Sequence, residues 1–255
     1  MYKIVPCIKE DSGRFTPGTH EVIEEVPLAI TINGRHALTA MVSPELTREF
    51  VTGILFTERI IHGVDEIESV HVEPGKVSVL TTNPFKILVS KKTVLSGCGG
   101  SSSYLDVAKL PQVTSDLVLD VATIVSALKE TLQSDLHVKT GGIHIIGLYD
   151  DSGAVIVTED IGRHNALDKV IGHGLMKGVD FSRTFVVSSG RISSEMVRKC
   201  LIAGIPVIVS RGATTTLAVG TAEQANLTVI GFVRGQKMNI YTHPGRVRGA
   251  GSPDP

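Results

Sequence analysis

The chain has 255 residues, enough for one large or two modest domains, and 42% of them are hydrophobic, which suffices for buried cores. A formal net charge of −1 and an aromatic content of 4% without tryptophan give no support to nucleic-acid binding. The three cysteines, Cys7, Cys98 and Cys200, are widely spaced, which argues against a disulfide framework and favours a reducing compartment. The sequence shows no secretory signal and no apolar run of about 18 residues, so we expect a cytoplasmic protein without a membrane partner.

The first half, residues 1–110, is predicted to form a small α+β domain. Patterns typical of strands occupy residues 3–8, 21–26, 28–32, 36–41, 67–72, 76–82 and 85–94. Asn33 and Gly34 predict a two-residue hairpin turn, because both residues tolerate positive φ. Ser43, Pro44 and Glu45 have the chemistry of a helix start, with the serine as N-cap.

The second half, residues 115–245, is predicted to form a three-layer α/β domain. Helical patterns alternate with short apolar strands, as expected where helices cover both faces of a sheet. The predicted strands are 143–149, 154–157, 184–187, 206–209 and 227–233. A Gly/Ser-rich tract at residues 95–103 lies between the halves, and the tail, residues 246–255, is predicted to be disordered.

The stretch from Glu159 to Lys169 concentrates charged and polar side chains at a predicted strand-to-helix junction. The first turn of a helix offers unpaired N–H groups and a positive dipole end, which suit a phosphate or carboxylate. Arg163 adds a planar guanidinium that can bind such an anion at two points. A capped helix with its charges facing water is the alternative, and the density of functional side chains favours a ligand site.

Six segments together resemble one protein family. They are EEVPLAITING (24–34), GILFTERII (53–61), TGGIH (140–144), EDIGRHNALDKVIG (159–172), SGRISSEMV (189–197) and GFVRGQKMNIYT (231–242). In this order they resemble the formate dehydrogenase accessory sulfurtransferase (FdhD) family over nearly the whole chain. The resemblance implies a C-terminal domain like that of cytidine deaminases, a homodimer, and transfer of sulfur from a cysteine desulfurase. The implied acceptor is the molybdenum bis(molybdopterin guanine dinucleotide) cofactor of formate dehydrogenase.

Cys98 lies in the Gly/Ser-rich tract, where it is expected to be exposed, and Lys91 and Lys92 can lower its pKa from the usual value of about 8.5. From the residues alone, an incidental linker cysteine is the alternative. In the resembled family this tract carries a Cys-x-x-Cys motif whose first cysteine holds sulfur as a persulfide, so Cys98 is the expected catalytic residue. Ser101 stands where the second cysteine would be. Cys200, on the apolar face of a predicted helix, is expected to be buried and inert.

A second group of residues is expected to bind the cofactor where loops follow the strands of the sheet. Arginines and a lysine in these loops suit its phosphates, and glycines let the backbone approach it. From the loops and the helix start, the expected residues are Arg163, Arg191, Gly141, Gly142, His144 and His164. The resemblance assigns to the cofactor the segment Phe232, Val233, Arg234, Gly235, Gln236 and Lys237. A GDP-like nucleotide is the expected mimic.

Several alternatives remain within this site. The side chains of Phe232 and Val233 are expected to belong to the strand core even if their backbone binds the ligand. His144 and His164 can serve in hydrogen bonding, proton transfer or structure. Asp160, with Glu159, can hold Arg163 or read a guanine edge.

Two other functions compete with sulfur transfer. A non-catalytic chaperone for the molybdenum cofactor is favoured by Ser101 and opposed by the retained Cys98. A zinc deaminase is suggested only by the expected fold, and it needs His-x-Glu followed by Pro-Cys-x-x-Cys. Ile145 and Ile146 follow His144, and the sequence contains no Cys-x-x-Cys, so we expect no zinc or other bound metal.

Overall fold

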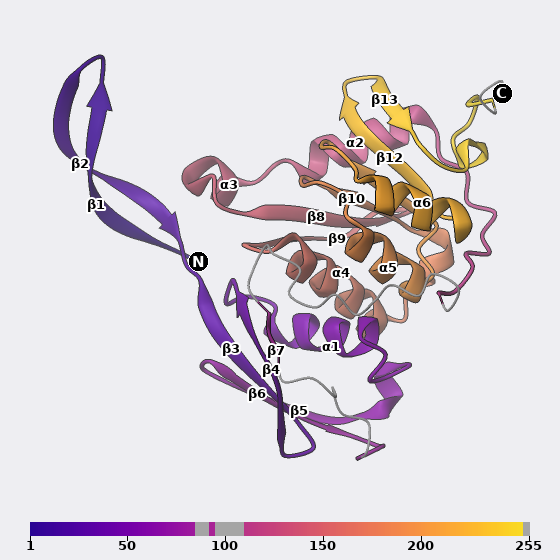
Figure 1. Cartoon of the computed structure of the whole chain (residues 1–255), viewed down its shortest axis with the longest axis horizontal. Helices are drawn as coiled ribbons and strands as arrows, with labels where there is room; N and C mark the ends of the chain where they lie inside the picture. The colour runs from indigo at the N-terminus through magenta and orange to yellow at the C-terminus, as the bar shows by residue number, and fades with distance from the viewer. Residues whose placement is uncertain (85–91, 95–109, 252–255) are drawn as a thin grey trace.

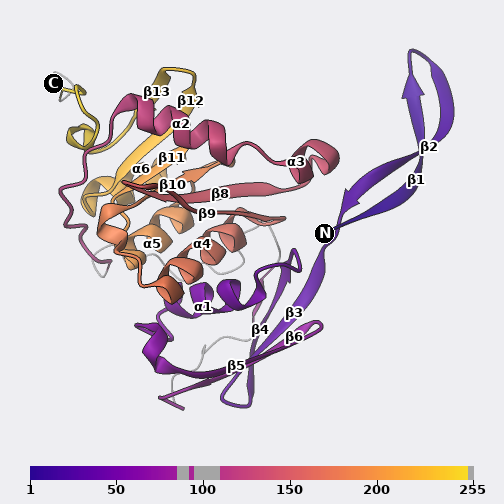
Figure 2. The ribbon, with the colours of Figure 1, turned by 180° about the vertical axis from the view of Figure 1, so that it is seen from behind.

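The structure, a computed structural model, describes residues 1–84, 92–94 and 110–251, with only the backbone described for 92–94. Two separate sheets with helices between them form the body of the molecule, and a two-stranded arm projects from it (Figure 1). Figure 2 shows the same arrangement from behind, with helices α1 and α4 lying between the two sheets. This is a mixed α/β architecture.

The N-terminal sheet has five strands in the order β5-β6-β3-β4-β7. They are β3 (Val26–Ile32), β4 (Arg35–Val42), β5 (Ile67–Glu73), β6 (Lys76–Thr81) and β7 (Lys92–Val94), with the 3-10 turn η1 (Val64–Glu66) before β5. The predicted hairpin turn is confirmed, because Asn33 and Gly34 have φ of 50° and 77° and β3 pairs with β4 in antiparallel fashion. Helix α1 (Thr47–Thr57) packs on this sheet through Phe50, Val51, Ile54 and Leu55.

Helix α1 begins later than the sequence predicted. Its N-cap is Leu46, at a φ of 54° and without a side-chain hydrogen bond. Ser43, the predicted cap, is instead buried against the other half of the chain. Its N–H donates to Oδ2 of Asp160 at 3.1 Å, and its Oγ accepts from the N–H of Ile161 at 3.1 Å. The prediction of Ser43 as a cap was wrong, because a partner more than a hundred residues away binds the side chain.

The arm is formed by β1 (Tyr2–Asp11) and β2 (Arg14–Ile23), which pair with each other and with no other described strand. The sequence predicted two shorter strands here and no turn between them. Ser12 and Gly13, with φ of 51° and 85°, make a tight turn that allows ten residues on each side to pair. The polar segment after Ile8 is therefore strand rather than loop.

The C-terminal sheet has six strands in the order β13-β12-β11-β10-β8-β9. They are β8 (His144–Asp150), β9 (Gly153–Asp160), β10 (Phe185–Ser188), β11 (Val207–Ser210), β12 (Thr228–Arg234) and β13 (Lys237–Ile240). Strands β10, β11 and β12 are parallel, whereas β8 and β13 are antiparallel to their neighbours. Strand β13 follows a tight turn at Gly235, with a φ of 59°, and was not predicted.

Helices cover both faces of this sheet, which gives three layers. One face packs against α4 (Arg163–Lys177), α5 (Ser194–Ala203) and α6 (Thr216–Gln224). The other face packs against α2 (Val121–Thr131), while the short α3 (Asp135–Thr140) leads back to β8. The 3-10 turns η3 (Phe181–Arg183) and η4 (Pro244–Arg246) complete the described elements. The likeness to cytidine deaminases remains a prediction.

The beginning of the predicted tail is ordered. Val247 is buried in the core on the α2 side of the sheet. Leu119 donates its N–H to the carbonyl of Arg246 at 2.9 Å and accepts from the N–H of Arg248 at 2.9 Å. The prediction of disorder from Arg246 onward was therefore wrong up to residue 251, and residues 252–255 lie outside the described part of the chain.

Helices α1 and α4 cross at very short range and join the two halves. A β-carbon added at Gly53 would lie 1.9 Å from the carbonyl oxygen of Asp168, and one at Gly172 would lie 1.9 Å from that of Glu49. Only glycine allows two helix backbones to approach so closely at both points. This crossing fixes the signature stretch, at the start of α4, against the N-terminal half.

Candidate functional site

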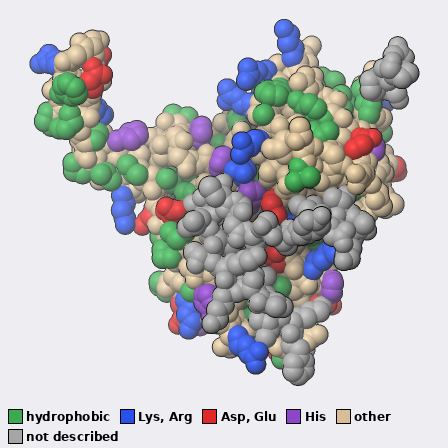
Figure 3. All heavy atoms as spheres, in the orientation of Figure 1, with side chains coloured by type: hydrophobic (Ala, Val, Ile, Leu, Met, Phe, Trp, Pro, Cys, Tyr) green, Lys and Arg blue, Asp and Glu red, His purple; other side chains and the backbone are tan. Residues whose placement is uncertain are grey.

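Most of the predicted binding residues lie at one edge of the C-terminal sheet. Strands β9, β10, β11 and β12 all run toward this edge, because β8 is antiparallel to both β9 and β10. Helices α4, α5 and α6 follow three of these strands and begin at the same edge. Figure 3 shows Lys, Arg and His side chains gathered over it, between the β12–β13 hairpin and the start of β8. In open α/β sheets this is the edge that binds ligands.

Asp160, in the signature stretch, is a structural residue. Its side chain is fully buried and lies 2.7 Å from Nζ of Lys169, which is also buried. Its carboxylate also accepts hydrogen bonds from the N–H of Gly162 and from Nδ2 of Asn165, both at 2.9 Å. A carboxylate so enclosed cannot reach a ligand, so the possibility that it reads a guanine edge is wrong. It holds the strand-to-helix turn on which the site is built.

Asp168 takes part in a second buried ion pair, with Lys199, and a hydrogen bond from Thr57 links this pair to the first half of the chain. Both of its carboxylate oxygens lie 2.8 Å from Nζ of Lys199 on α5, and Thr57 of α1 donates to Oδ1 at 2.8 Å. Burial raises the pKa of Asp168, and the Lys199 charge opposes that rise. The sequence analysis did not identify Lys199, because no local pattern relates it to Asp168.

The half-buried Arg163 and His164 of the signature stretch lie near His144 of β8. A β-carbon added at Gly190 would lie 2.8 Å from Nδ1 of His144 and 3.6 Å from Cδ of Arg163, so both side chains pack against Gly190. His164 shares a hydrogen bond of 3.1 Å between its Nε2 and Oγ of Ser193. The structure thus brings together three predicted residues, His144 from β8 and Arg163 and His164 from α4, against the loop after β10.

The two histidines are held neutral. Burial, followed by the nearby Arg163 guanidinium, lowers the pKa of His164 to about 3. The pKa of His144 is also lowered, by burial and then by Arg163, although the charge of Asp160 opposes the shift. At neutral pH both rings therefore carry one N–H donor and one bare nitrogen acceptor. Each can donate a hydrogen bond to an anion without adding a charge.

The starts of α4 and α5 are not capped by a side chain. The N-cap of α4 is Gly162, and the N-cap of α5 is Ser193, whose hydroxyl is engaged by His164. Helix α6 differs, because Thr215 accepts a hydrogen bond from the N–H of Ala218. Two helix starts with N–H groups free of a side-chain cap, close to Arg163, are suited to an anion. Arg191 is exposed in the loop before α5.

The segment from Phe232 to Lys237 forms the end of β12 and its turn into β13. Val233 is buried, as predicted, but Phe232 is 40% exposed, so the expectation that both side chains belong to the core was wrong for Phe232. Phe232 has a φ of 52°, and the register of β12 with β13 shifts beside it. A bulge turns its ring outward at the site edge, where Arg234, Gly235, Gln236 and Lys237 are also exposed.

The two predicted glycines before β8 serve mainly as structure. Gly141 ends α3 with a φ of 62°. A β-carbon at Gly142 would lie 2.9 Å from Cγ2 of Ile23, at the root of the arm. Gly142 therefore packs against the arm, next to the start of β8 and His144.

One loop at this edge was missed by the sequence analysis. Residues 210–216 repeat, after β11, the pattern Ser-x-Gly-x-x that residues 188–192 show after β10. In each loop the serine hydroxyl accepts from the glycine N–H, at 3.1 Å for Ser188 and at 2.8 Å for Ser210. The hydroxyl of Thr214, in the second loop, is buried and has no hydrogen-bond partner. The Ser-x-Gly pattern shared by the two loops could have indicated from the sequence that the second loop belongs to the same edge.

The cysteines differ in environment. Cys98 lies outside the described residues. Cys200 is fully buried, and burial raises its pKa to about 12, so it stays a thiol at neutral pH. This supports the prediction that Cys200 is inert. Cys7 is half-buried on the arm.

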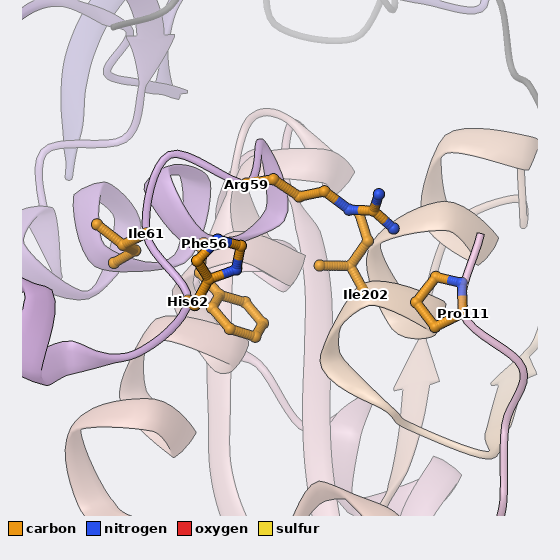
Figure 4. Close-up of a pocket in the computed structure, with 6 residues that line it drawn as sticks. All are labelled: Phe56, Arg59, Ile61, His62, Pro111 and Ile202. Carbon is orange, nitrogen blue, oxygen red and sulfur yellow. The ribbon is translucent and has the colours of Figure 1, made fainter. Parts of the chain in front are cut away.

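A cavity of about 350 Å³ lies between the two halves, away from the site edge (Figure 4). Figure 4 shows Phe56, His62 and Ile61 from the end of α1 and the loop after it, with Ile202 near the end of α5. The site edge lies at the start of α5, so this cavity is at the opposite end of that helix. It contains none of the predicted site residues.

Within the described ranges, no three His, Cys, Asp or Glu side chains come together in a way that could hold a metal ion. Of the helices in the same ranges, none has the length and apolar character needed to cross a membrane.

The fold and this edge define a class of protein: a three-layer α/β domain with basic side chains gathered at one sheet edge, packed against a smaller α+β unit. Comparison with known proteins narrows the class. Residues 23–248 match the model of the FdhD/NarQ family, and the chain belongs to that family.

Relatives and a solved structure agree with this assignment. The chain is 36% identical to the sulfur carrier protein FdhD of Bacillus pumilus, over 92% of this chain and 93% of the relative. It is 34% identical to the protein of the same name from Bacillus subtilis, over 93% and 94%. It superposes with a TM-score of 0.82 and 29% identity on a crystal structure described as a proposed formate dehydrogenase accessory protein from Desulfotalea psychrophila, covering 96% of this chain and 99% of that one.

Proposed function

We propose that the protein is a sulfur carrier, a sulfurtransferase that loads Cys98 from a cysteine desulfurase and passes the sulfur to a molybdenum cofactor for formate dehydrogenase. The curated names of its relatives describe sulfur carriers, which favours this function over a chaperone that only binds the cofactor. We also propose that the protein is cytoplasmic and works as a homodimer.

One observation ties Cys98 to the site. Val94, the last residue of β7, pairs with Ala40, and the next residue of β4, Met41, accepts a hydrogen bond from Nδ2 of Asn165 at 2.8 Å. The end of β7 therefore lies close to the start of the signature helix. We propose that Cys98, four residues further along the sequence, acts at this edge.

The proposed chemistry has two steps. The Cys98 thiolate attacks the outer sulfur of a desulfurase persulfide, the donor S–S bond breaks, and the donor leaves as a thiolate while Cys98 holds the persulfide. The outer sulfur of the Cys98 persulfide can leave as hydrosulfide only if two electrons are supplied. Because Ser101 cannot act as a resolving thiol, we propose that an external thiol attacks the inner sulfur. It forms a mixed disulfide with Cys98 and expels hydrosulfide toward the acceptor.

The acceptor, molybdenum bis(molybdopterin guanine dinucleotide), is bound as a substrate. The uncapped starts of α4 and α5 and the neutral imidazoles of His144 and His164 are suited to its phosphates. Arg163, Arg191, Arg234 and Lys237 supply the opposite charge. The exposed Phe232 ring offers an apolar face to a purine or pterin.

The first test is intact mass spectrometry after incubation with a cysteine desulfurase and cysteine. We expect the native chain to gain one sulfur atom and Cys98→Ala to gain none. Cys7→Ala and Cys200→Ala are matched controls that should load like the native chain. If the native chain gains no sulfur from a donor that loads another acceptor, sulfur transfer is refuted and cofactor binding alone remains.

The second test is calorimetric titration with GDP as the probe of the binding edge. Arg191→Ala should weaken binding by about 10-fold to 100-fold, because each charge-assisted hydrogen bond contributes about 1.5–3 kcal/mol. Arg183→Ala is the matched control, since Arg183 precedes β10 at the other end of the strand from Arg191. Equal weakening by both changes would contradict this placement of the site.

A further inference from the structure

The arm formed by β1 and β2 has one apolar face. Cross-strand partners project to the same side of a hairpin, and the register pairs Tyr2 with Ile23, Ile8 with Pro17 and Glu10 with Phe15. This register defines the apolar face of the arm: Tyr2, Ile4, Pro6, Ile8, Phe15, Pro17 and Ile23, together with the polar Glu10, Thr19 and Glu21. The opposite face is more polar: it carries Lys3, Lys9, Asp11, Arg14, Thr16 and His20 beside Val5, Cys7 and Val22. A period-2 pattern of this kind is typical of a sheet with one covered side.

The described residues of the chain cover only the root of this face. Ile23 packs against Gly142, and Nζ of Lys139 lies 5.7 Å from the centroid of the Tyr2 ring. Beyond the root, Ile4 is 66% exposed, Ile8 65% and Phe15 71%. The arm stands clear of the body in both views of the molecule (Figures 1 and 2). Isolated two-stranded hairpins are marginally stable in water, so a covering surface would stabilise this one.

The composition of the face indicates what kind of surface covers it. Glu10 and Glu21 are its only charged residues, so it offers no cations to a nucleic acid or an anionic membrane. Its apolar residues instead suit a protein surface of similar character.

The size of the face favours a second copy of the same chain. Ten residues of strand span about 34 Å, and two strands are about 10 Å wide, so the face covers roughly 340 Å². One arm on one partner would bury roughly 700 Å² in total, below the 1,200–2,000 Å² of stable interfaces. Two arms exchanged about a two-fold axis would bury roughly 1,400 Å², which is sufficient.

We propose that the apolar face of the arm packs on the body of a second copy, and that two copies exchange their arms reciprocally. This proposal rests on the homodimer of the proposed function and adds its contact surface. It does not depend on sulfur transfer. Because the root of the arm touches Gly142, just before β8, the exchanged arms would join the two molecules next to their binding edges.

Sedimentation velocity on the full chain over a wide concentration range tests the proposal. The double variant Ile8→Asp/Phe15→Asp should raise the dimer dissociation constant by at least about 100-fold, because burial of each such side chain stabilises by about 1.5–3 kcal/mol. Thr16→Asp, next to Phe15 but on the opposite face, is the matched control and should dimerise like the native chain. Circular dichroism should show that both variants are folded.

Three results would overturn the arm exchange. They are a native chain that is monomeric throughout the range, a double variant that dimerises as the native chain does, and an arm that is covered only when formate dehydrogenase is added. Sulfur loading of Cys98 is measured on the same variants by mass spectrometry. Variants that still load sulfur show that a failure of the arm exchange is not a failure of the proposed function.

Discussion

At the scale of single residues, the signature stretch divides into buried groups that build the site and half-buried groups that face it. Asp160, Asp168 and Lys169 are buried and paired within the protein, whereas Arg163 and His164 are half-buried at the site edge. The buried and the half-buried residues are all polar and lie close together in the sequence. Burial therefore decides which of these side chains can face the site edge. Two predictions follow this division.

His164 should make stability depend on pH. Its folded pKa of about 3 lies below the ordinary 6.5, so the unfolded chain binds a proton that the folded chain does not. Its contribution is complete above pH 6.5 and is lost as the pH falls toward 3, at up to about 1.4 kcal/mol per pH unit. Between pH 7 and 5, the native chain should lose on the order of 2 kcal/mol more than His164→Gln. Urea unfolding at the two pH values measures this, and equal losses would contradict the buried neutral ring.

Breaking the buried pair of Asp168 and Lys199 should be costly. Asp168→Asn leaves the Lys199 charge buried without its counter-charge, which lowers the free energy of unfolding by about 3–5 kcal/mol. Asp151→Asn is the control, because its ion pair with Arg183 is exposed and contributes at most about 1 kcal/mol. Chemical denaturation of the two variants should show this difference. Similar losses would mean that Asp168 is better solvated than the structure shows.

At the scale of elements, the crossing of α1 and α4 depends on two glycines. Gly172→Ala would drive a methyl group into the backbone of α1, and overpacking of this kind costs about 1–3 kcal/mol or more. Gly220→Ala, in α6, meets no atom within 4 Å and should instead stabilise the helix by about 0.8–1 kcal/mol. Unfolding free energies of opposite sign are the expected result. A neutral Gly172→Ala would show that the helices can move apart at little cost.

At the scale of the whole molecule, the two sheets should unfold together. Residues from the first half, Met41, Ser43 and Thr57, bond with Asn165, Asp160 and Asp168 of the second. Separating the halves would leave these buried polar groups without partners, which costs about 1–3 kcal/mol for each. Scanning calorimetry should therefore show one transition with equal calorimetric and van't Hoff enthalpies. Two resolved transitions would contradict this coupling.

The sequence alone determined the features that depend on neighbours in the chain. The Asn33-Gly34 turn, the apolar strands of the C-terminal sheet and the helix after the signature stretch follow from local conformational preference and periodicity, and the structure confirms them. The six segments that resemble one family were likewise enough to indicate that family, which the match over residues 23–248 confirms.

Only the tertiary structure decided which polar residues are buried and what they bind. Ser43 has the chemistry of a cap but bonds to Asp160 and Ile161, and Phe232 lies in a strand pattern but turns outward at a bulge. Val247 has few local signals and is nonetheless held in the core beside α2. Each outcome depends on partners far away in sequence. Local patterns report what a residue can do, whereas packing determines which of its possible partners reaches it.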